Sequence, residues 1–419
     1  MTDETRATTD AGSRSSAPGP GRATLWVILA SATLTVMAGA ILGPIVPAIQ
    51  SNLGVSESLA GLIITTHGAL IVAVSPVAGW VIDRVGPRRP FVAGLLLYGA
   101  GGGAGLVVDS FAPLLASRAV LGIGVAFVYV GVTVLIYDCY EGRRMSRALG
   151  LRSSANSVGA VVWPLVGGGL GTLSWQAPFG VYLIAVPLGV VAAATVPETG
   201  RSAAGESDGH GADGPDATDD GDEDGADGVT GVLAALRRRP GLLSVYLLYF
   251  AANALLYAIV VFYPGLLEGI GLTSSLSISL YLAANGAAGG TSAALYDRLV
   301  ERTGRHALVG AAVALWVVAF AFAAAADSAL TAVPAVVAFG LGQGLVFPAS
   351  FAWIEALAPA ARQGQYSSYL ASAGYTGQFV SPVLFGPLVP AFGVRGVFVA
   401  AAALSAAGGV AFAVALTRR

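Results

Sequence analysis

Three ionisable side chains lie inside or at the edge of long apolar runs of this sequence. His67 and Arg118 fall well inside such runs, and Asp83 falls at the end of one. An arginine at the centre of a membrane costs about 2.5–3.5 kcal/mol on insertion scales, so it is normally kept for a function. We therefore expect Arg118 to face the interior of a helix bundle or a water-filled cavity on the substrate or proton pathway.

His67 is the one group inside an apolar run whose ordinary pKa lies near physiological pH. It could carry a proton, or it could be a neutral hydrogen-bonding group in a cavity wall. The absence of an acidic partner nearby in the sequence favours the second role. All acids outside the central polar segment fall in tails, in loops or near the ends of apolar runs, so no carboxylate at the membrane centre is available to carry a proton.

Uncharged polar side chains form a second group with the chemistry to bind a solute. Amide and phenol groups recur inside otherwise apolar runs at Tyr129, Asn156, Asn253, Tyr257, Asn285, Gln343 and Gln378. Such a set predicts a cavity for neutral, amphipathic or weakly cationic solutes, in which Arg118 would tolerate an anion. Hydrogen bonding between helices is the alternative role for part of this set.

Catalytic and metal-binding patterns are missing from the sequence. There is one cysteine, Cys139, and no cluster of His, Asp or Glu has ligand spacing, so we predict no metal site and no cofactor. A nucleophile paired with an acid or a base, which an enzyme would need, is not found either. We therefore predict that the protein is not an enzyme.

Membrane-spanning helices must position these side chains. Of the 419 residues, 55% are hydrophobic and 11% are charged, whereas soluble domains usually carry about 25% charged residues. Runs of about 20 apolar residues are long enough to cross a hydrocarbon core about 30 Å thick. The predicted spans are 24–49, 58–82, 90–108, 112–136, 150–172, 177–196, 241–263, 275–295, 306–326, 329–353, 366–388 and 394–416.

The arginines set the predicted orientation. All 22 basic residues are arginines, and only Arg118 and Arg395 fall outside the tails, the central polar segment and the alternate loops on one face. Because Lys and Arg concentrate in cytoplasmic loops, we predict a multi-pass protein of the cell membrane with both termini in the cytoplasm. In this assignment the connection between the fourth and fifth runs holds Arg143, Arg144, Arg147 and Arg152.

A polar segment divides the chain into two parts. Residues 201–230 carry ten acids and lack an apolar pattern, so this segment cannot bury enough apolar surface to offset its ordering entropy. We predict a disordered cytoplasmic tail (1–23), a first six-helix bundle (24–196), an acidic cytoplasmic linker (197–240) and a second six-helix bundle (241–419).

The two bundles carry related sequences. An offset of 218 residues relates Gly122 and Gly124 to Gly340 and Gly342. The same offset relates Gly86 to Gly304, and Asp83-Arg84 recurs as Asp297-Arg298. An internal repeat of this kind is typical of secondary transporters.

The stretch "GWVIDRVGPRRP", residues 79–90, resembles the loop between the second and third helices of the major facilitator superfamily. Pro87 departs from the family pattern, because it occupies the first basic position after the glycine. The motif residues are Gly79, Asp83, Arg84, Gly86, Arg88 and Arg89. Their counterparts in the second half are Asp297, Arg298, Gly304 and Arg305.

The resemblance implies roles for three motifs. It implies that Asp83 docks on the start of the eleventh helix, near residues 365–368, and latches the cytoplasmic side shut. "RAVLGIG", from Arg118, resembles a fourth-helix motif in which the arginine is linked to proton transfer. The fifth run resembles the glycine-proline motif of exporters, with Trp163 replacing a glycine before the proline. That packing motif comprises Gly159, Pro164, Gly167 and Gly168.

We predict an all-α membrane protein with twelve transmembrane helices in two pseudo-symmetric six-helix bundles. The resemblance implies a transporter that works by alternating access and exports small amphipathic or drug-like solutes, with exchange for protons left open. A uniporter or differently coupled carrier of sugars or other metabolites is the alternative, and a membrane-embedded enzyme or sensor is a more distant one. The expected partners are a small-molecule substrate and the lipid bilayer, with no nucleic acid, and the protein is expected to be a monomer.

Overall fold

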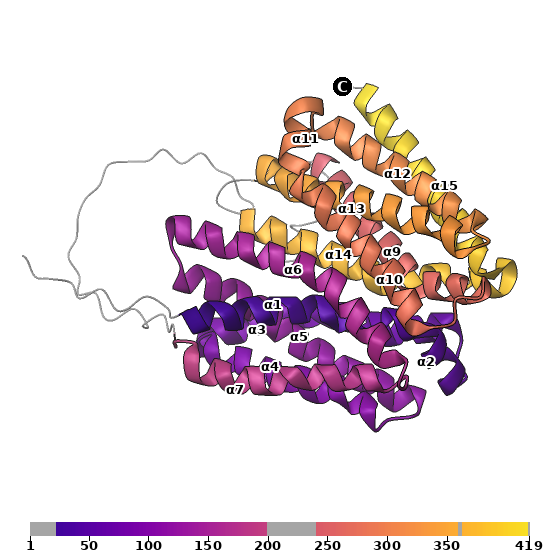
Figure 1. The fold of residues 1–419 in the computed structure, drawn as a ribbon. Helices are drawn as coiled ribbons and strands as arrows, with labels where there is room; N and C mark the ends of the chain where they lie inside the picture. The colour runs from indigo at the N-terminus through magenta and orange to yellow at the C-terminus, as the bar shows by residue number, and fades with distance from the viewer. Residues whose placement is uncertain (1–21, 199–239, 359–362, 418–419) are drawn as a thin grey trace, which may run out of the picture.

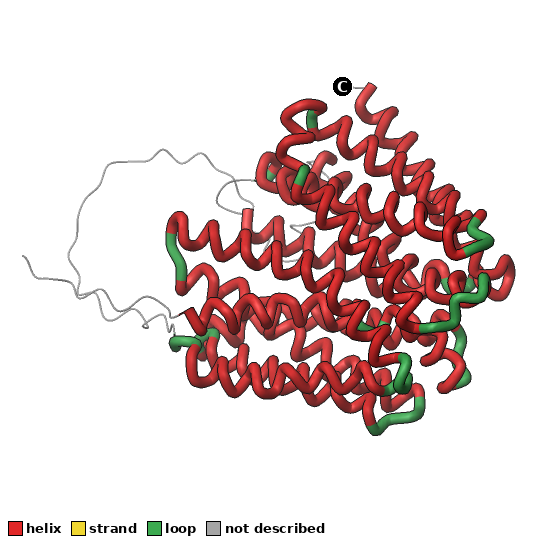
Figure 2. The backbone as a smooth tube through the Cα atoms, viewed as in Figure 1, coloured by secondary structure: helices red, strands yellow, loops and turns green. Residues whose placement is uncertain are grey.

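The structure is a computed structural model that describes residues 22–198, 240–358 and 363–417. Within these ranges the regular elements are helices, and there is no strand (Figure 2). Almost all of the predicted tail (1–23) and linker (197–240) falls outside the described residues. Predictions for those two segments therefore remain predictions.

The first half of the chain folds into a bundle of long helices. Between α1 and α2 lies a 3₁₀ turn, η1 (Gly43–Ile45), and a longer 3₁₀ segment, η3 (Ala177–Ile184), runs into α7. The helices are α1 (Arg22–Ala40), α2 (Val46–Leu53), α3 (Glu57–Val85), α4 (Arg88–Gly103), α5 (Phe111–Cys139), α6 (Gly142–Gly171) and α7 (Ala185–Thr195).

The second half repeats this arrangement after the linker. One short helix, α11, has no separate counterpart, because in the first half the equivalent residues form the end of α3. The helices are α9 (Pro240–Gly269), α10 (Ser275–Ala294), α11 (Tyr296–Thr303), α12 (Arg305–Ala325), α13 (Ala329–Leu357), α14 (Gln363–Phe385) and α15 (Leu388–Thr417).

Each predicted span overlaps one of these helices or a pair of consecutive ones. By length and composition, eight helical segments of the described chain suit a membrane crossing. The long helices α4, α6, α10 and α14 do not meet that criterion, yet they lie alongside the others (Figure 1). They are rich in Gly and Ser, and small residues of this kind are typical of helices that pack closely against other helices.

The internal repeat is visible in the backbone. Gly86 ends α3 with φ 80° and ψ 161°, and Gly304 ends α11 with φ 80° and ψ 155°. Residues with a side chain rarely adopt a positive φ, so glycine is required at both turns. The two halves therefore share this turn as well as its sequence.

Glycines at equivalent positions of the two halves also allow equivalent helices to cross closely. A Cβ on Gly122 would lie 2.9 Å from the Cα of His67 in α3, and a Cβ on Gly124 would lie 2.5 Å from the backbone nitrogen of Tyr98 in α4. In the second half Gly340 meets α10 at Asn285, and Gly342 meets α12 at Trp316. Thus α5 packs between α3 and α4 as α13 packs between α10 and α12.

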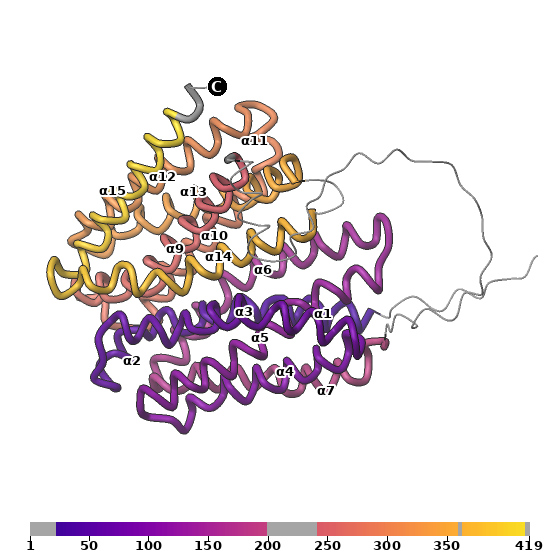
Figure 3. The backbone as a smooth tube through the Cα atoms, turned by 180° about the vertical axis from the view of Figure 1, so that it is seen from behind, coloured from indigo at the N-terminus to yellow at the C-terminus, as the bar shows by residue number. Residues whose placement is uncertain are grey.

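Each half has its own apolar core, and the halves meet along α3 with α14 and α6 with α10. They pack together from one end, here called the sealed end, where Gly61 meets Pro382 and Gly171 meets Ser275, as far as the middle of the bundle, where Gly286 meets Ala160. At the other end, the arginine-rich end (residues 83–89 and 297–305), the halves diverge (Figures 1 and 3). Nothing lies within 4 Å of a Cβ placed on Gly79 or Gly150 near that end.

Candidate functional site

An aromatic and basic cluster bridges the two halves. Tyr129 of α5 and Tyr375 of α14 meet edge to face with ring centroids 5.6 Å apart. The Arg152 guanidinium lies 5.5 Å from the centre of the Tyr129 ring. It also donates a hydrogen bond to the Thr133 hydroxyl at 2.9 Å. Tyr129, Arg152 and Tyr375 are only partly buried, so the cluster borders the space between the halves.

Amide groups continue this cluster into the second half. The Gln378 side chain donates a hydrogen bond to Asn253 Oδ1 at 3.0 Å, and Asn253 donates to the Tyr249 carbonyl at 2.9 Å. Tyr249 in turn packs against Phe347 and Phe351 at centroid distances of 5.1 and 5.8 Å. The Gln378 Oε1 atom is buried without a hydrogen-bond partner. It can therefore accept a hydrogen bond from a bound solute.

His67 and Tyr257 approach each other where the halves join. His67 is 1% exposed, and its Nδ1 lies 2.6 Å from the Ile64 carbonyl oxygen. Its ring and the Tyr257 hydroxyl both approach Gly39 of α1. The offset of 218 relates His67 to Asn285, and each sits at a close helix crossing. This placement agrees with a neutral hydrogen-bonding role for His67.

Arg118 lies inside the first half, apart from the cluster. Its side chain is 1% exposed and donates hydrogen bonds to the carbonyls of Gly101 and Gly102, at 3.3 and 2.7 Å. Two aromatic rings flank it, with the guanidinium 5.0 Å from the centre of Phe179 and 4.7 Å from that of Tyr182. The expected interior position is thus observed, but Arg118 does not line the space between the halves.

The remaining predicted pathway residues are scattered. Asn285 and Gln343 are buried in the second half, on α10 and α13, and each has one polar atom without a partner. Asn156, on α6, is partly buried and also keeps a free buried oxygen. Of the predicted set, therefore, the structure brings together Tyr129, Asn253 and Gln378, with Tyr257 and His67 adjacent to each other.

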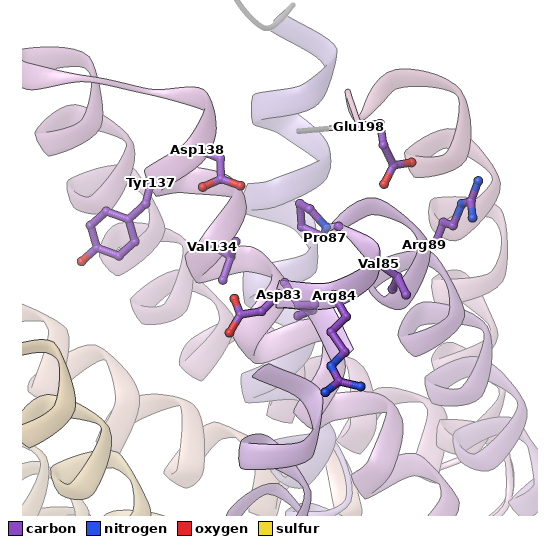
Figure 4. A pocket seen from close by; sticks show the side chains of 11 residues that line it. Asp83, Arg84, Val85, Pro87, Arg89, Val134, Tyr137, Asp138 and Glu198 are labelled. Atoms are coloured by element: carbon purple, nitrogen blue, oxygen red, sulfur yellow. The ribbon is translucent and has the colours of Figure 1, made fainter. Parts of the chain in front are cut away.

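Asp83 faces a cavity of about 490 Å³ at the arginine-rich end. The cavity lies within the first half, and Tyr137, Asp138 and Glu198 also line it (Figure 4). Asp83 is exposed, and it makes no hydrogen bond or ion pair with the described residues of α14 in this conformation. The latch implied by the resemblance would require the opposite conformation.

Other members of the loop motif have structural contacts. Arg84 stacks 3.9 Å over the Trp80 ring, and Arg88 donates a hydrogen bond to the Ala193 carbonyl of α7. Arg89 lines the same cavity as Asp83. In the second half, Arg305 donates to the Ala352 carbonyl at 3.2 Å, and Asp297 and Arg298 are exposed on α11.

The glycines of the predicted packing motif sit at helix contacts. A Cβ on Gly167 would overlap the Ile41 carbonyl oxygen, and one on Gly168 would overlap Ser279 of the other half. Gly159 lies near Trp163, whose indole donates to the Thr33 carbonyl at 3.0 Å. Pro164 is buried within α6. The Trp163 side chain therefore packs against α1 and is held there by this hydrogen bond.

The sequence did not indicate that Arg152 and Tyr249 belong to the site. The fifth span was predicted to begin at residue 150, but α6 begins at Gly142, so Arg152 lies ten residues inside the helix and not in a loop. That offset is about 15 Å along the helix axis. Tyr249 gave no distinct signal, because aromatic residues are common in such runs. The helical spacing of Arg152 with Asn156 was the available clue to an inward face.

The sequence matches one known protein family over both halves of the chain. The model of the family described as Major Facilitator Superfamily matches residues 28–298 and 245–419. Multidrug resistance protein 1 of Bacillus subtilis (strain 168) is 31% identical over 159 residues, which is 37% of this chain and 40% of that protein. The Bacillibactin exporter of the same strain is 30% identical over 161 residues, 36% of this chain and 40% of the relative. These alignments span less than half the length of either relative.

Solved structures share the fold over nearly the whole chain. A bacterial homologue of the human lysosomal transporter Spinster, in an inward-facing and unoccupied conformation, gives a TM-score of 0.75 at 17% identity. That match covers 93% of this chain and 95% of the other. The nucleoside transporter NupG (D323A mutant) gives 0.77 at 11% identity, covering 94% and 99%.

Proposed function

This chain belongs to the Major Facilitator Superfamily, and from that premise we propose that it is a secondary transporter that exports small amphipathic solutes by alternating access. The observation that carries the proposal is the cluster of Tyr129, Arg152, Tyr375 and Gln378, drawn from both halves. A site shared by two repeats is released to one side or the other when the repeats rock.

The conformation supports loading from the arginine-rich end. The halves touch at the sealed end and diverge at the other. In a multi-pass protein with arginine-rich loops in the cytoplasm, this state is open to the cytoplasm, and both termini lie there. We place the protein in the cell membrane as a monomer, with Asp83 latching the cytoplasmic side after the halves rock.

The relatives narrow the solute class. They include a multidrug resistance protein, an exporter of bacillibactin and, in Staphylococcus aureus, a quinolone resistance protein named NorA that is 27% identical over 136 residues, 32% of this chain and 35% of that protein. Export of small amphipathic or drug-like solutes is therefore the proposed direction and class for this chain. The aromatic walls of the cluster support an amphipathic solute.

One observation favours a carrier that is not coupled to protons. In the part of the chain that the structure describes, every Asp and Glu lies in a loop between helices, on the short α11 or within three residues of a helix end. A proton antiporter usually needs a titratable group on the pathway. Among the residues that the structure describes, His67 is the one candidate for such a group near the cluster. A uniporter of neutral or charged metabolites is thus the second candidate function.

Uptake by purified protein in proteoliposomes tests both candidates. A panel of fluorescent amphipathic solutes of negative, neutral and positive charge is offered with and without an imposed pH gradient. Saturable uptake of at least one solute is expected, and protein-free liposomes give the baseline. Uptake driven by the gradient and lost in His67→Ala would establish proton coupling, and gradient-independent uptake would establish the uniporter. No saturable uptake of any solute would contradict the transport proposal.

A further inference from the structure

Arg152 supplies a positive charge to the cluster between the halves, which otherwise consists of phenol and amide groups. The described acids are confined to helix ends, connections and α11. By contrast Arg152 lies within α6, ten residues from its start, beside Tyr129 near the middle of α5. The fixed charge that a bound solute meets at this cluster is therefore positive.

Among the residues that the structure describes, the two groups in contact with the Arg152 guanidinium are neutral. The guanidinium has five N–H donors; one bonds to the neutral Thr133 hydroxyl, and one face lies over the Tyr129 ring. Neither group carries a negative charge. Since the side chain is half-buried between helices, its field is screened less than that of an exposed arginine. A planar guanidinium with free donors is suited to bind an oxyanion through two parallel hydrogen bonds.

Aromatic surfaces beside Arg152 would hold the rest of such a solute. The edge-to-face pair of Tyr129 and Tyr375 joins the two halves at 5.6 Å, and Tyr249 with Phe347 extends the aromatic surface. Phenol rings of this kind bury large apolar area and also offer hydroxyl groups. The arrangement combines an anion site with an apolar wall.

We infer that the solutes of this transporter are amphipathic organic oxyanions, whose carboxylate or comparable group binds Arg152 while the aromatic body packs against Tyr129 and Tyr375. The inference rests on the proposed transport function and names its substrate class. It also differs from the weakly cationic class that the amides and tyrosines alone suggest. Arg118 cannot take this role, because it is 1% exposed and bonded to backbone carbonyls.

Three dansyl compounds test the inference, because they share a fluorophore and differ in charge. Dansylglycine carries a carboxylate, dansylamide is neutral and dansylcadaverine carries an ammonium group. Binding to the full chain in nanodiscs is measured by equilibrium dialysis, with empty nanodiscs subtracted. We expect dansylglycine to bind about tenfold more tightly than dansylamide, and dansylcadaverine to bind most weakly, as expected for one charge-assisted contact.

Variants locate the preference at Arg152. Arg152→Gln is expected to remove the preference for dansylglycine while dansylamide binding stays within about twofold, because the aromatic walls are unchanged. Arg152→Lys is expected to keep part of the preference, since it retains the charge but loses the planar fork. The matched control is Arg147→Gln, an exposed arginine on the same helix, which should bind all three as the wild type does.

The outcomes separate the inference from the transport proposal. Equal or tighter binding of dansylcadaverine by the wild type would overturn the anion preference without any variant, as would a preference that survives in Arg152→Gln. Saturable uptake of dansylamide or dansylcadaverine in proteoliposomes would still support transport in either case. Failure of all three compounds to bind and to be taken up would overturn the transport proposal and the inference together.

Discussion

The Arg118 guanidinium is held by the carbonyl end of a helix. Gly101 and Gly102 lie in the last turn of α4, which ends at Gly103. The last carbonyls of a helix lack intrahelical partners and carry the negative end of its dipole. A buried arginine there satisfies these carbonyls and gains a partial counter-charge. We therefore expect this contact to join α4 to α5 and to stabilise the first half.

Replacing Arg118 by Ala should therefore destabilise the protein. The loss of two hydrogen bonds to a charged donor, with two buried carbonyls left without this partner, is expected to lower the free energy of unfolding by roughly 2–3 kcal/mol. Thermal unfolding in detergent, followed by tryptophan fluorescence, measures the change. The protein that remains folded should still bind dansylglycine as the wild type does. An unchanged melting temperature combined with lost transport would place Arg118 on the pathway instead.

At the scale of one element, α6 places three consecutive glycines in three different surroundings. Gly167 packs against the Ile41 backbone in its own half, and Gly168 packs against Ser279 in the other half. At Gly169, by contrast, an added Cβ would have nothing within 4 Å. Adding one methyl group at each position in turn therefore tests the interior of one half, the contact between the halves and open space.

Alanine at each of these positions should give three distinct results. Gly167→Ala is expected to lower stability by roughly 1–3 kcal/mol, because a backbone contact must open. Gly168→Ala should push the halves apart at the sealed end and increase the labelling rate of a single cysteine at position 275, in protein with Cys139 replaced by Ser. Gly169→Ala should be neutral or more stable by about 0.5–1 kcal/mol, because alanine favours helix. Equal labelling rates in Gly168→Ala and Gly169→Ala would count against a contact that holds the halves together.

The sequence was a better guide to elements than to which side chains meet. Apolar runs and arginine-rich loops predicted the helices, and the offset of 218 predicted the equivalence of Gly86 and Gly304, because hydrophobic length and glycine requirements are local properties. The cluster depends instead on where α6 begins and on how α5, α9 and α14 meet. Arg152 was assigned to a loop for that reason, and Arg118, which was expected on the pathway, is buried inside the first half in this conformation.

At the scale of the whole molecule, the proposed transport cycle requires the contact at the sealed end to open. That contact brings α6 and α10 so close that a Cβ on Gly171 would lie 3.0 Å from the Ser275 Cβ. Disulfides need Cβ atoms about 3.5–4.5 Å apart, so two cysteines at these positions can pair after a small outward shift that also clears the Ile45 side chain, which a Cβ on Gly171 would overlap. Such a bond would hold the two halves in the conformation described.

Gly171→Cys with Ser275→Cys, in protein with Cys139 replaced by Ser, should therefore form a disulfide under mild oxidation and stop transport. Reduction should restore the rate, because the halves can then rock again. The oxidised protein should still bind dansylglycine, since the arginine-rich end stays open while the sealed end is fixed. Gly169→Cys with Ser275→Cys is the matched control, because position 169 faces open space, and it should neither cross-link nor lose transport. If the cross-linked protein transported at the rate of its reduced form, the sealed end would not be the contact that opens, and alternating access about α6 and α10 would be wrong for this protein.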